Sequence, residues 1–151
     1  MTSSAAASAS RDQYPHFFEL ATRWADNDVY GHVNNAAYYY YFDTAVNRFL
    51  VDRGVLDPAG SEIFGVVVET GCRYFSSVSF PDLLDIGVRV AKVGNSSVRY
   101  ELAVFRRGES AAAAAGHFVQ VYVGRQGRRP VPVPEPVRLA LAALQPAPPR
   151  G

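Results

Sequence analysis

Residues 16–24 alternate between two sides of an extended chain. Phe18, Leu20 and Trp24 would point to one side, whereas the residues between them, among them Glu19, would point to the other. A period of two residues is typical of a strand with one buried face. This segment is therefore predicted to be the first strand.

The segment 36–54 follows a helical period, because apolar residues recur every three or four positions and form a wide face. Asn34 or Asn35 is expected to cap the N-terminus of this helix and Gly54 its C-terminus. The consecutive tyrosines favour a strand by propensity, but the caps and the period agree on a helix. About 18 residues at ~1.5 Å each span about 27 Å, enough to cross a whole sheet.

Between residues 63 and 124 the chain returns to the alternation of strands. The turns GNSS at 94–97 and RGE at 107–109 separate segments of the length expected for an antiparallel meander. The run 110–124 opens with alanines that favour a helix but ends in HFVQVYV, so we interpret it as one strand. Four prolines in seven residues then end the sheet, and residues 137–144 are predicted to form a short helix.

These elements define an α+β fold in which an antiparallel sheet of about five strands is wrapped around one long central helix. We expect a flexible N-terminal tail at 1–13, a single domain at 14–145 and a flexible C-terminal tail at 146–151. A sheet of this size leaves edges that usually pair with another copy, so a homodimer or homotetramer is expected.

Composition narrows the classes of function. The chain has 151 residues, about half of them apolar, and a net charge of +1, which argues against a nucleic-acid partner. No apolar run is long enough to span a membrane, and Cys72 is the only cysteine, so a cytoplasmic protein without internal disulfides is expected. The three histidines lack ligand spacing for zinc, and we expect neither a metal nor a cofactor.

The stretch 23–35, RWADNDVYGHVNN, gathers the groups needed for acyl transfer just before the predicted helix. Asp28 supplies a carboxylate that can attack a carbonyl or activate water. Gly31 permits a turn closed to other residues. The helix start offers unpaired N–H groups that can stabilise an oxyanion, which is worth about 10²–10³ in rate for one donor.

A thioester suits so sparse a site. Its leaving thiolate has a pKa near ~8.5 and departs without a strong general acid. An amide would need more machinery, and the sequence contains no G-x-S-x-G nucleophile elbow.

The pattern D-x-D-x-x-G-H-V-N-N, followed by a tyrosine, resembles that of hotdog-fold thioesterases of the 4-hydroxybenzoyl-CoA thioesterase type. The resemblance covers residues 15–125, including the order of strands and helix. It implies a hotdog fold, an acyl-CoA substrate, and dimers or tetramers with active sites at the subunit interface. It also implies that Asp28 is the catalytic carboxylate, that the N–H of Asn35 polarises the thioester oxygen, and that Asp26 is structural.

Further site residues complete the hypothesis. Glu69 ends an apolar strand, where an unpaired charge would be costly to bury. Ser97 lies in a turn where members of the family that the pattern resembles often contact CoA. The predicted catalytic residues are Asp28, Gly31, His32 and Asn35, and the predicted substrate-binding residues are Asn34, Tyr38, Glu69 and Ser97.

Two other functions remain open to comparison. A non-catalytic hotdog protein that binds acyl-CoA or another small ligand would use Asp28 only to hold the turn. The second alternative is an enzyme of the hydratase branch of the same fold, whose typical pattern has a His five residues after an Asp. Here His32 lies four residues after Asp28, so the spacing does not match. We therefore predict an acyl-CoA thioesterase.

Overall fold

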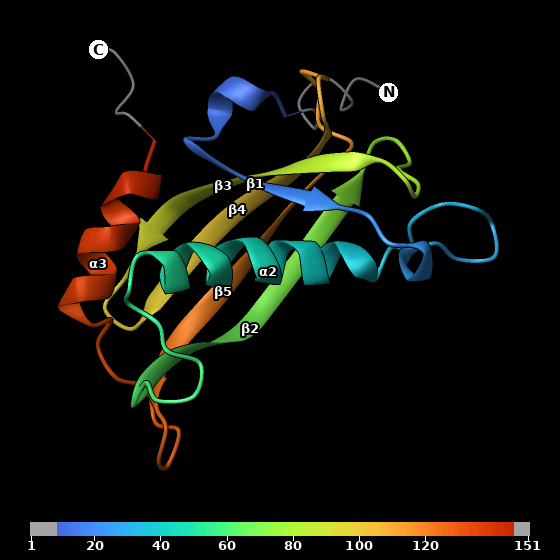
Figure 1. Cartoon of the computed structure of the whole chain (residues 1–151). Helices are drawn as coiled ribbons and strands as arrows, with labels where there is room; N and C mark the ends of the chain where they lie inside the picture. The colour runs from blue at the N-terminus through green and yellow to red at the C-terminus, as the bar shows by residue number, and fades with distance from the viewer. Residues whose placement is uncertain (1–8, 147–151) are drawn as a thin grey trace.

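The computed structural model describes residues 9–146 and contains one sheet and two α-helices (Figure 1). Residues 1–8 and 147–151, which belong to the two predicted tails, lie outside the described part. In chain order the elements are η1 (Arg11–Gln13), β1 (His16–Ala21), η2 (Trp24–Asp26), α2 (Ala37–Asp52), β2 (Ile63–Tyr74), β3 (Leu83–Val93), β4 (Ser97–Arg106), β5 (Ala114–Gly124), α3 (Glu135–Leu141) and η3 (Ala142–Leu144).

The five strands form one antiparallel sheet in the order β1-β3-β4-β5-β2. This confirms the predicted number of strands and their antiparallel pairing. β3 and β4 lie near the middle, where Ile86 faces Val104 and Val88 faces Leu102. All four side chains are fully buried on the face that α2 covers, as their alternation in the sequence requires.

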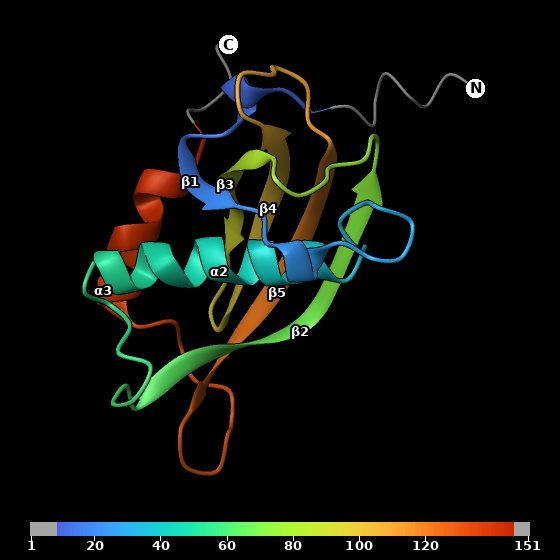
Figure 2. The same cartoon turned by 45° about the vertical axis from the view of Figure 1, so that its right-hand side comes forward.

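Helix α2 crosses that face of the sheet (Figures 1 and 2). It begins at Ala37 with Ala36 as N-cap, and no side chain caps it. The side-chain oxygen of Asn34 instead accepts the N–H of Ala36 at 2.9 Å, which keeps residues 34–36 in a turn. At the other end, Gly54 takes a φ of +72°, which ends the helix as predicted.

The prediction of one long central helix needs correction. α2 has 16 residues and spans about 24 Å, less than expected. The sheet of one chain lies on only one side of it: Phe42 and Phe49 are buried against the strands, whereas Tyr40 on the other side is 73% exposed. One chain therefore does not surround its helix.

The opposite face of the sheet is partly covered by the start of the described chain. Residues 9–13, assigned to the tail from the sequence, include the short turn η1, and Ala9 packs with Tyr14, Ala103 and Phe105 in a second apolar cluster. After the sheet, the predicted short helix is present as α3, followed by η3. Within residues 9–146, no helix combines the length and apolar character needed to cross a membrane.

We predict that Gly116→Ala weakens the contact between sheet and helix. A methyl group at this β5 position would collide with the carbonyl oxygen of Gly71 on β2 and approach Cε2 of Phe42 on α2 to 2.8 Å. Overpacking of this kind costs about 1–3 kcal/mol, to be measured as the free energy of unfolding in urea. Gly124→Ala is the control on the same strand, because its methyl group would meet only the carbonyl of Gln126 at 3.5 Å. Equal stability of the two variants would contradict the prediction.

Candidate active site

The loop between β1 and α2 is anchored by a buried carboxylate. The side chain of Asp26 accepts the hydroxyl of Tyr41 at 2.8 Å, the N–H of Arg23 at 2.9 Å and the guanidinium of Arg23 at 2.8 and 3.0 Å. Burial alone would raise the pKa of Asp26, but these donors outweigh it and hold the pKa below its ordinary value. Burial raises the pKa of Tyr41, and the hydrogen bond to Asp26 raises it further. Asp26 is therefore placed as a structural residue.

Asp28 opens a tight turn within this loop. Its carbonyl accepts the N–H of Gly31 at 3.1 Å, and its own N–H donates to the carbonyl of His32 at 2.9 Å. Gly31 has a φ of +83°, the conformation for which glycine was predicted. One carboxylate oxygen of Asp28 accepts the N–H of Tyr30 at 2.9 Å, while its other oxygen has no hydrogen-bond partner between residues 9 and 146.

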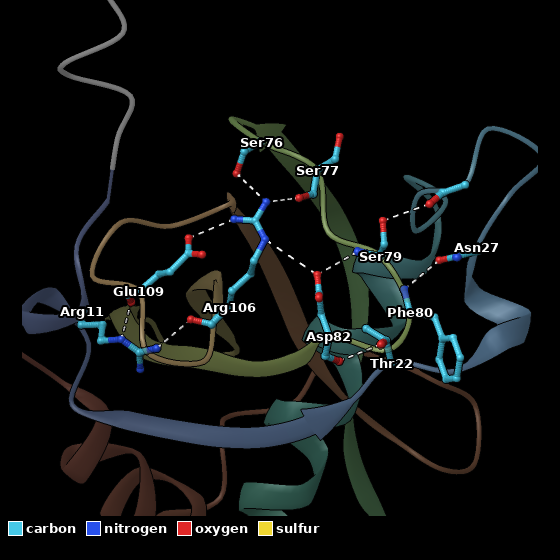
Figure 3. A network of polar contacts seen from close by, with 11 residues as sticks. Arg11, Thr22, Asn27, Ser76, Ser77, Ser79, Phe80, Asp82, Arg106 and Glu109 are labelled. Atoms are coloured by element: carbon cyan, nitrogen blue, oxygen red, sulfur yellow. Dashed lines mark hydrogen bonds and ion pairs between the residues drawn. The ribbon is translucent and has the colours of Figure 1, made fainter.

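The segment that joins β2 to β3 holds this loop in place (Figure 3). The N–H of Val33 donates to the carbonyl of Val78 at 2.8 Å. The hydroxyl of Ser79 donates to the carbonyl of Gly31 at 2.9 Å. The N–H of Phe80 donates to the side-chain oxygen of Asn27 at 3.0 Å. Three bonds thus fix the turn that carries Asp28.

A hollow of about 350 Å³ lies between the loop, the start of α2 and the end of β2. It is lined by Asp28, Val33, Asn35, Tyr38, Tyr74, Phe75, Ser76 and Ser77. The N–H of Asn35 finds no acceptor in the described part of the chain, whereas its carbonyl accepts the hydroxyl of Tyr74 at 3.0 Å. Asp28, which has a free carboxylate oxygen, and Asn35, which has a free N–H, therefore line the same hollow.

Aromatic and apolar side chains continue from this hollow along α2. The ring of Tyr38 meets that of Tyr74 edge to face, with centroids 4.9 Å apart. The first turn of α2 also borders a second hollow of about 270 Å³, lined by Ala36, Tyr39, Tyr40, Asp43, Val67, Thr70 and Phe118. The start of α2 thus borders both the hollow that contains Asp28 and a mainly apolar one.

Of the eight predicted site residues, Asp28, Asn35 and Tyr38 line the hollow. Gly31 and Asn34 lie in the adjoining loop and border a further open depression beside Asp28. His32 is exposed, and the only hydrogen bond made by this residue in the described structure is through its carbonyl.

The structure does not bring Glu69 and Ser97 to this hollow. Glu69 lies on the face of the sheet opposite α2, where its carboxylate is 2.8 Å from Nε2 of His117 and 3.8 Å from the guanidinium of Arg99. Ser97 is the first residue of β4, directly after the turn that joins β3 to β4. That turn is separated from the start of β3, near the Asp28 loop, by an 11-residue strand, on the order of 30 Å.

The predicted site residues did not include the end of β2. Tyr74, Phe75, Ser76 and Ser77 form one wall of the hollow, although they lie about forty positions from the loop. The local signals were the aromatic Tyr74 and Phe75, which suit either a pocket or the core, and the pair of serines that follows them. Cys72 nearby is half-buried, and burial raises the pKa of its thiol to about 11, so it is not a reactive thiolate.

No group of three or more His, Cys, Asp and Glu side chains suited to a metal ion occurs in the part of the chain that the structure describes.

Comparisons with known proteins identify the family of the chain. Residues 22–141 match the family described as the thioesterase-like superfamily. The chain belongs to this superfamily, and it is therefore a thioester hydrolase. A comparison with the curated proteins finds no match.

Solved structures share the fold over most of both chains. The PA5185 protein of Pseudomonas aeruginosa is 55% identical, with a TM-score of 0.90 over 91% of this chain and 96% of its own. The PA2801 protein of the same organism, a candidate thioesterase, is 28% identical, with a TM-score of 0.79 over 85% and 99%. A 1,4-dihydroxy-2-naphthoyl-CoA thioesterase of Synechocystis is 15% identical, with a TM-score of 0.77 over 83% and 94%, and shares the fold alone.

The Asp26 anchor predicts a pH-dependent stability. Because the folded state lowers the pKa of Asp26 from its ordinary 3.8, its ionised form stabilises the protein above the unfolded-state pKa. That contribution is lost as the pH falls through the folded-state pKa. We expect Asp26→Asn to reduce the free energy of unfolding at pH 7 by about 1–3 kcal/mol, and by less at pH 3.

Tyr41→Phe tests the same contact from the helix, because it removes only the hydroxyl that donates to Asp26. It should destabilise the protein at pH 7 while leaving the packing of the ring unchanged. Urea unfolding of both variants at the two pH values is the measurement. A loss that is the same at pH 3 and pH 7 for Asp26→Asn would refute this assignment of the ionised form.

Proposed function

We propose that this protein hydrolyses the thioester of an acyl-CoA to a free acid and CoA, with Asp28 as the catalytic carboxylate. The observation that carries the proposal is the common hollow at the start of α2, which is lined both by Asp28, with its free carboxylate oxygen, and by Asn35, with its free N–H. Within the superfamily, the D-x-D-x-x-G-H-V-N-N spacing favours the group of the 4-hydroxybenzoyl-CoA thioesterases.

In the proposed reaction, the thioester carbonyl oxygen accepts the N–H of Asn35. The partial positive charge at the start of α2 stabilises the negative charge that develops on this oxygen. Asp28 either attacks the carbonyl carbon or takes a proton from a water that attacks it. If Asp28 is the base, the carbon–sulfur bond then breaks and the thiolate of CoA receives the proton that Asp28 took from water. If Asp28 is the nucleophile, the thiolate leaves as the anhydride forms. Water then hydrolyses the anhydride, which restores the carboxylate of Asp28, releases the acid and supplies the proton for the thiolate.

The neighbouring residues have supporting roles in this proposal. Gly31 supplies the conformation of the turn that presents Asp28, and Asn34 holds the turn before α2. Tyr38 forms the wall where the acyl group enters the apolar space. His32 shapes the rim of the loop.

Glu69 and Ser97 lie away from the Asp28 of their own chain. We keep them as substrate-binding candidates for the nucleotide end of an extended CoA, or for the site of a neighbouring copy. β2 is an edge strand on which Val67 and Val68 are 45% and 60% exposed. These exposed apolar side chains favour a homodimer through this edge, with a homotetramer as the larger form. A cytoplasmic location stays a prediction.

A non-catalytic protein that binds acyl-CoA is the second candidate. The observation in its favour is the bond from the N–H of Tyr30 to Asp28, since this contact alone gives the carboxylate a structural role. The two candidates differ in whether the second oxygen of Asp28 is used.

We predict that Asp28→Asn lowers the rate of thiol release by about a hundredfold or more. An asparagine oxygen can still accept the N–H of Tyr30, so the turn is kept and only the charge and basicity are removed. The measurement is a free-thiol assay with short, long and aromatic acyl-CoAs. Asp52→Asn is the control, because Asp52 ends α2 in an exposed ion pair with Arg48.

Two results would contradict the proposal. Wild-type protein that binds CoA thioesters without releasing thiol from any of them would favour the binding protein. An Asp28→Asn variant with the wild-type rate would assign the chemistry to other residues.

A further inference from the structure

Arg106 ends β4 and reaches the connection between β2 and β3, far from the loop in sequence (Figure 3). Its side chain is 28% exposed. Nη2 donates to the carbonyl of Ser77 and, at 3.4 Å, to the hydroxyl of Ser76. Nε lies 3.7 Å from the carboxylate of Asp82, and Nη1 lies 3.0 Å from that of Glu109. One guanidinium therefore fastens both ends of the segment 76–82.

That segment is also the support of the Asp28 loop. Three of its residues, Val78, Ser79 and Phe80, hydrogen-bond to loop residues on both sides of the turn. Ser76 and Ser77 at its start line the hollow itself. A displacement of the segment would therefore move the turn and the opposite wall together.

Asp82 connects the two sets of contacts. Its carboxylate accepts the N–H of Ser79 at 3.0 Å and faces Arg106. Its carbonyl accepts the hydroxyl of Thr22 at 2.7 Å, in the chain that leads into the loop. Arg106 thus fixes the acceptor that orients Ser79, and Ser79 in turn holds the carbonyl of Gly31.

These contacts need the shape of an arginine. The guanidinium has a planar fork of donors that can serve a carbonyl, a hydroxyl and two carboxylates in fixed directions. A lysine keeps the charge but offers a single ammonium group, which cannot reach all these acceptors at once. The charge alone would therefore not hold the segment in this geometry.

We infer that Arg106 is a positioning residue for the proposed reaction, which sets the distance between Asp28 and the N–H of Asn35 through the segment 76–82. This inference rests on the proposed function. It assigns to Arg106 no contact with the substrate. A small misplacement of reacting groups is costly, since about 1 Å can reduce a rate by about a hundredfold.

The test is the steady-state kinetics of Arg106→Lys in the full-length protein, with the best acyl-CoA of the free-thiol assay. We expect kcat to fall about tenfold or more, with KM changed by less than about twofold. Arg107→Lys is the matched control. Arg107 is the next residue, and its guanidinium pairs with Glu19 and Asp85 rather than with the segment 76–82. Its kinetics should stay at the wild-type level.

A double-mutant cycle separates positioning from a general loss of structure. Positioning acts on Asp28, so Arg106→Lys should have little further effect on the residual rate of Asp28→Asn. A loss of folded protein would reduce both rates by the same factor and would overturn the inference. Ser79→Ala is a milder second variant, because it removes only the hydroxyl that holds Gly31. It should lower kcat in the same direction.

The outcomes distinguish this inference from the proposed function. Inactivity of Asp28→Asn together with wild-type kinetics of Arg106→Lys would overturn the role of Arg106 alone. A rise in KM at unchanged kcat would make Arg106 a substrate contact and would also overturn it. Full activity of Asp28→Asn would instead overturn the proposed function.

Discussion

The buried carboxylate of Asp26 is the constraint on which the site loop depends. A charge removed from water must be compensated by donors, and here they come from Arg23 just before it and from Tyr41 on α2. The carbonyl of the same residue accepts the N–H of Asn34 at 2.8 Å. Asp26 therefore joins the end of β1, the chain entering α2 and the helix itself. Because residues 26 and 34 are held together, the chain between them has to reverse direction within a few residues.

Much of the fold could be predicted from the sequence because its causes are local. Apolar residues alternate along 83–93 and 97–106 because one face of each strand packs against a helix. The structure buries the apolar residues of that face. Gly54 ends α2 because its conformation is a property of glycine itself. The helix start was less predictable, because Asn34 uses its side chain on the turn before the helix rather than as an N-cap. Its use there depends on where the preceding loop is anchored.

The residues that line the candidate site could be predicted only where they are close in sequence. Asp28, Gly31 and Asn35 occupy one loop, and their spacing sets their proximity. Tyr74 and Ser77 reach the same hollow through the pairing of β2 with β5, which brings together groups that no local pattern connects. Glu69 illustrates the opposite case. Its position after an apolar run predicted a place beside the substrate pocket, but a bulge in β2 between Val67 and Glu69 accompanies its placement on the outer face beside His117.

A thioester is the substrate for which so few groups are enough. One oxygen of Asp28 is committed to the N–H of Tyr30, which fixes the direction of the carboxylate and leaves the other oxygen for the proposed chemistry. In the proposed reaction, the N–H of Asn35 has its direction fixed by the start of α2, so no reorganisation is needed when charge develops on the substrate. Because a thiolate leaves without a strong acid, the proposed reaction needs no third catalytic group beside Asp28 and Asn35. The accuracy of the supports around the loop then matters more than the number of reacting groups.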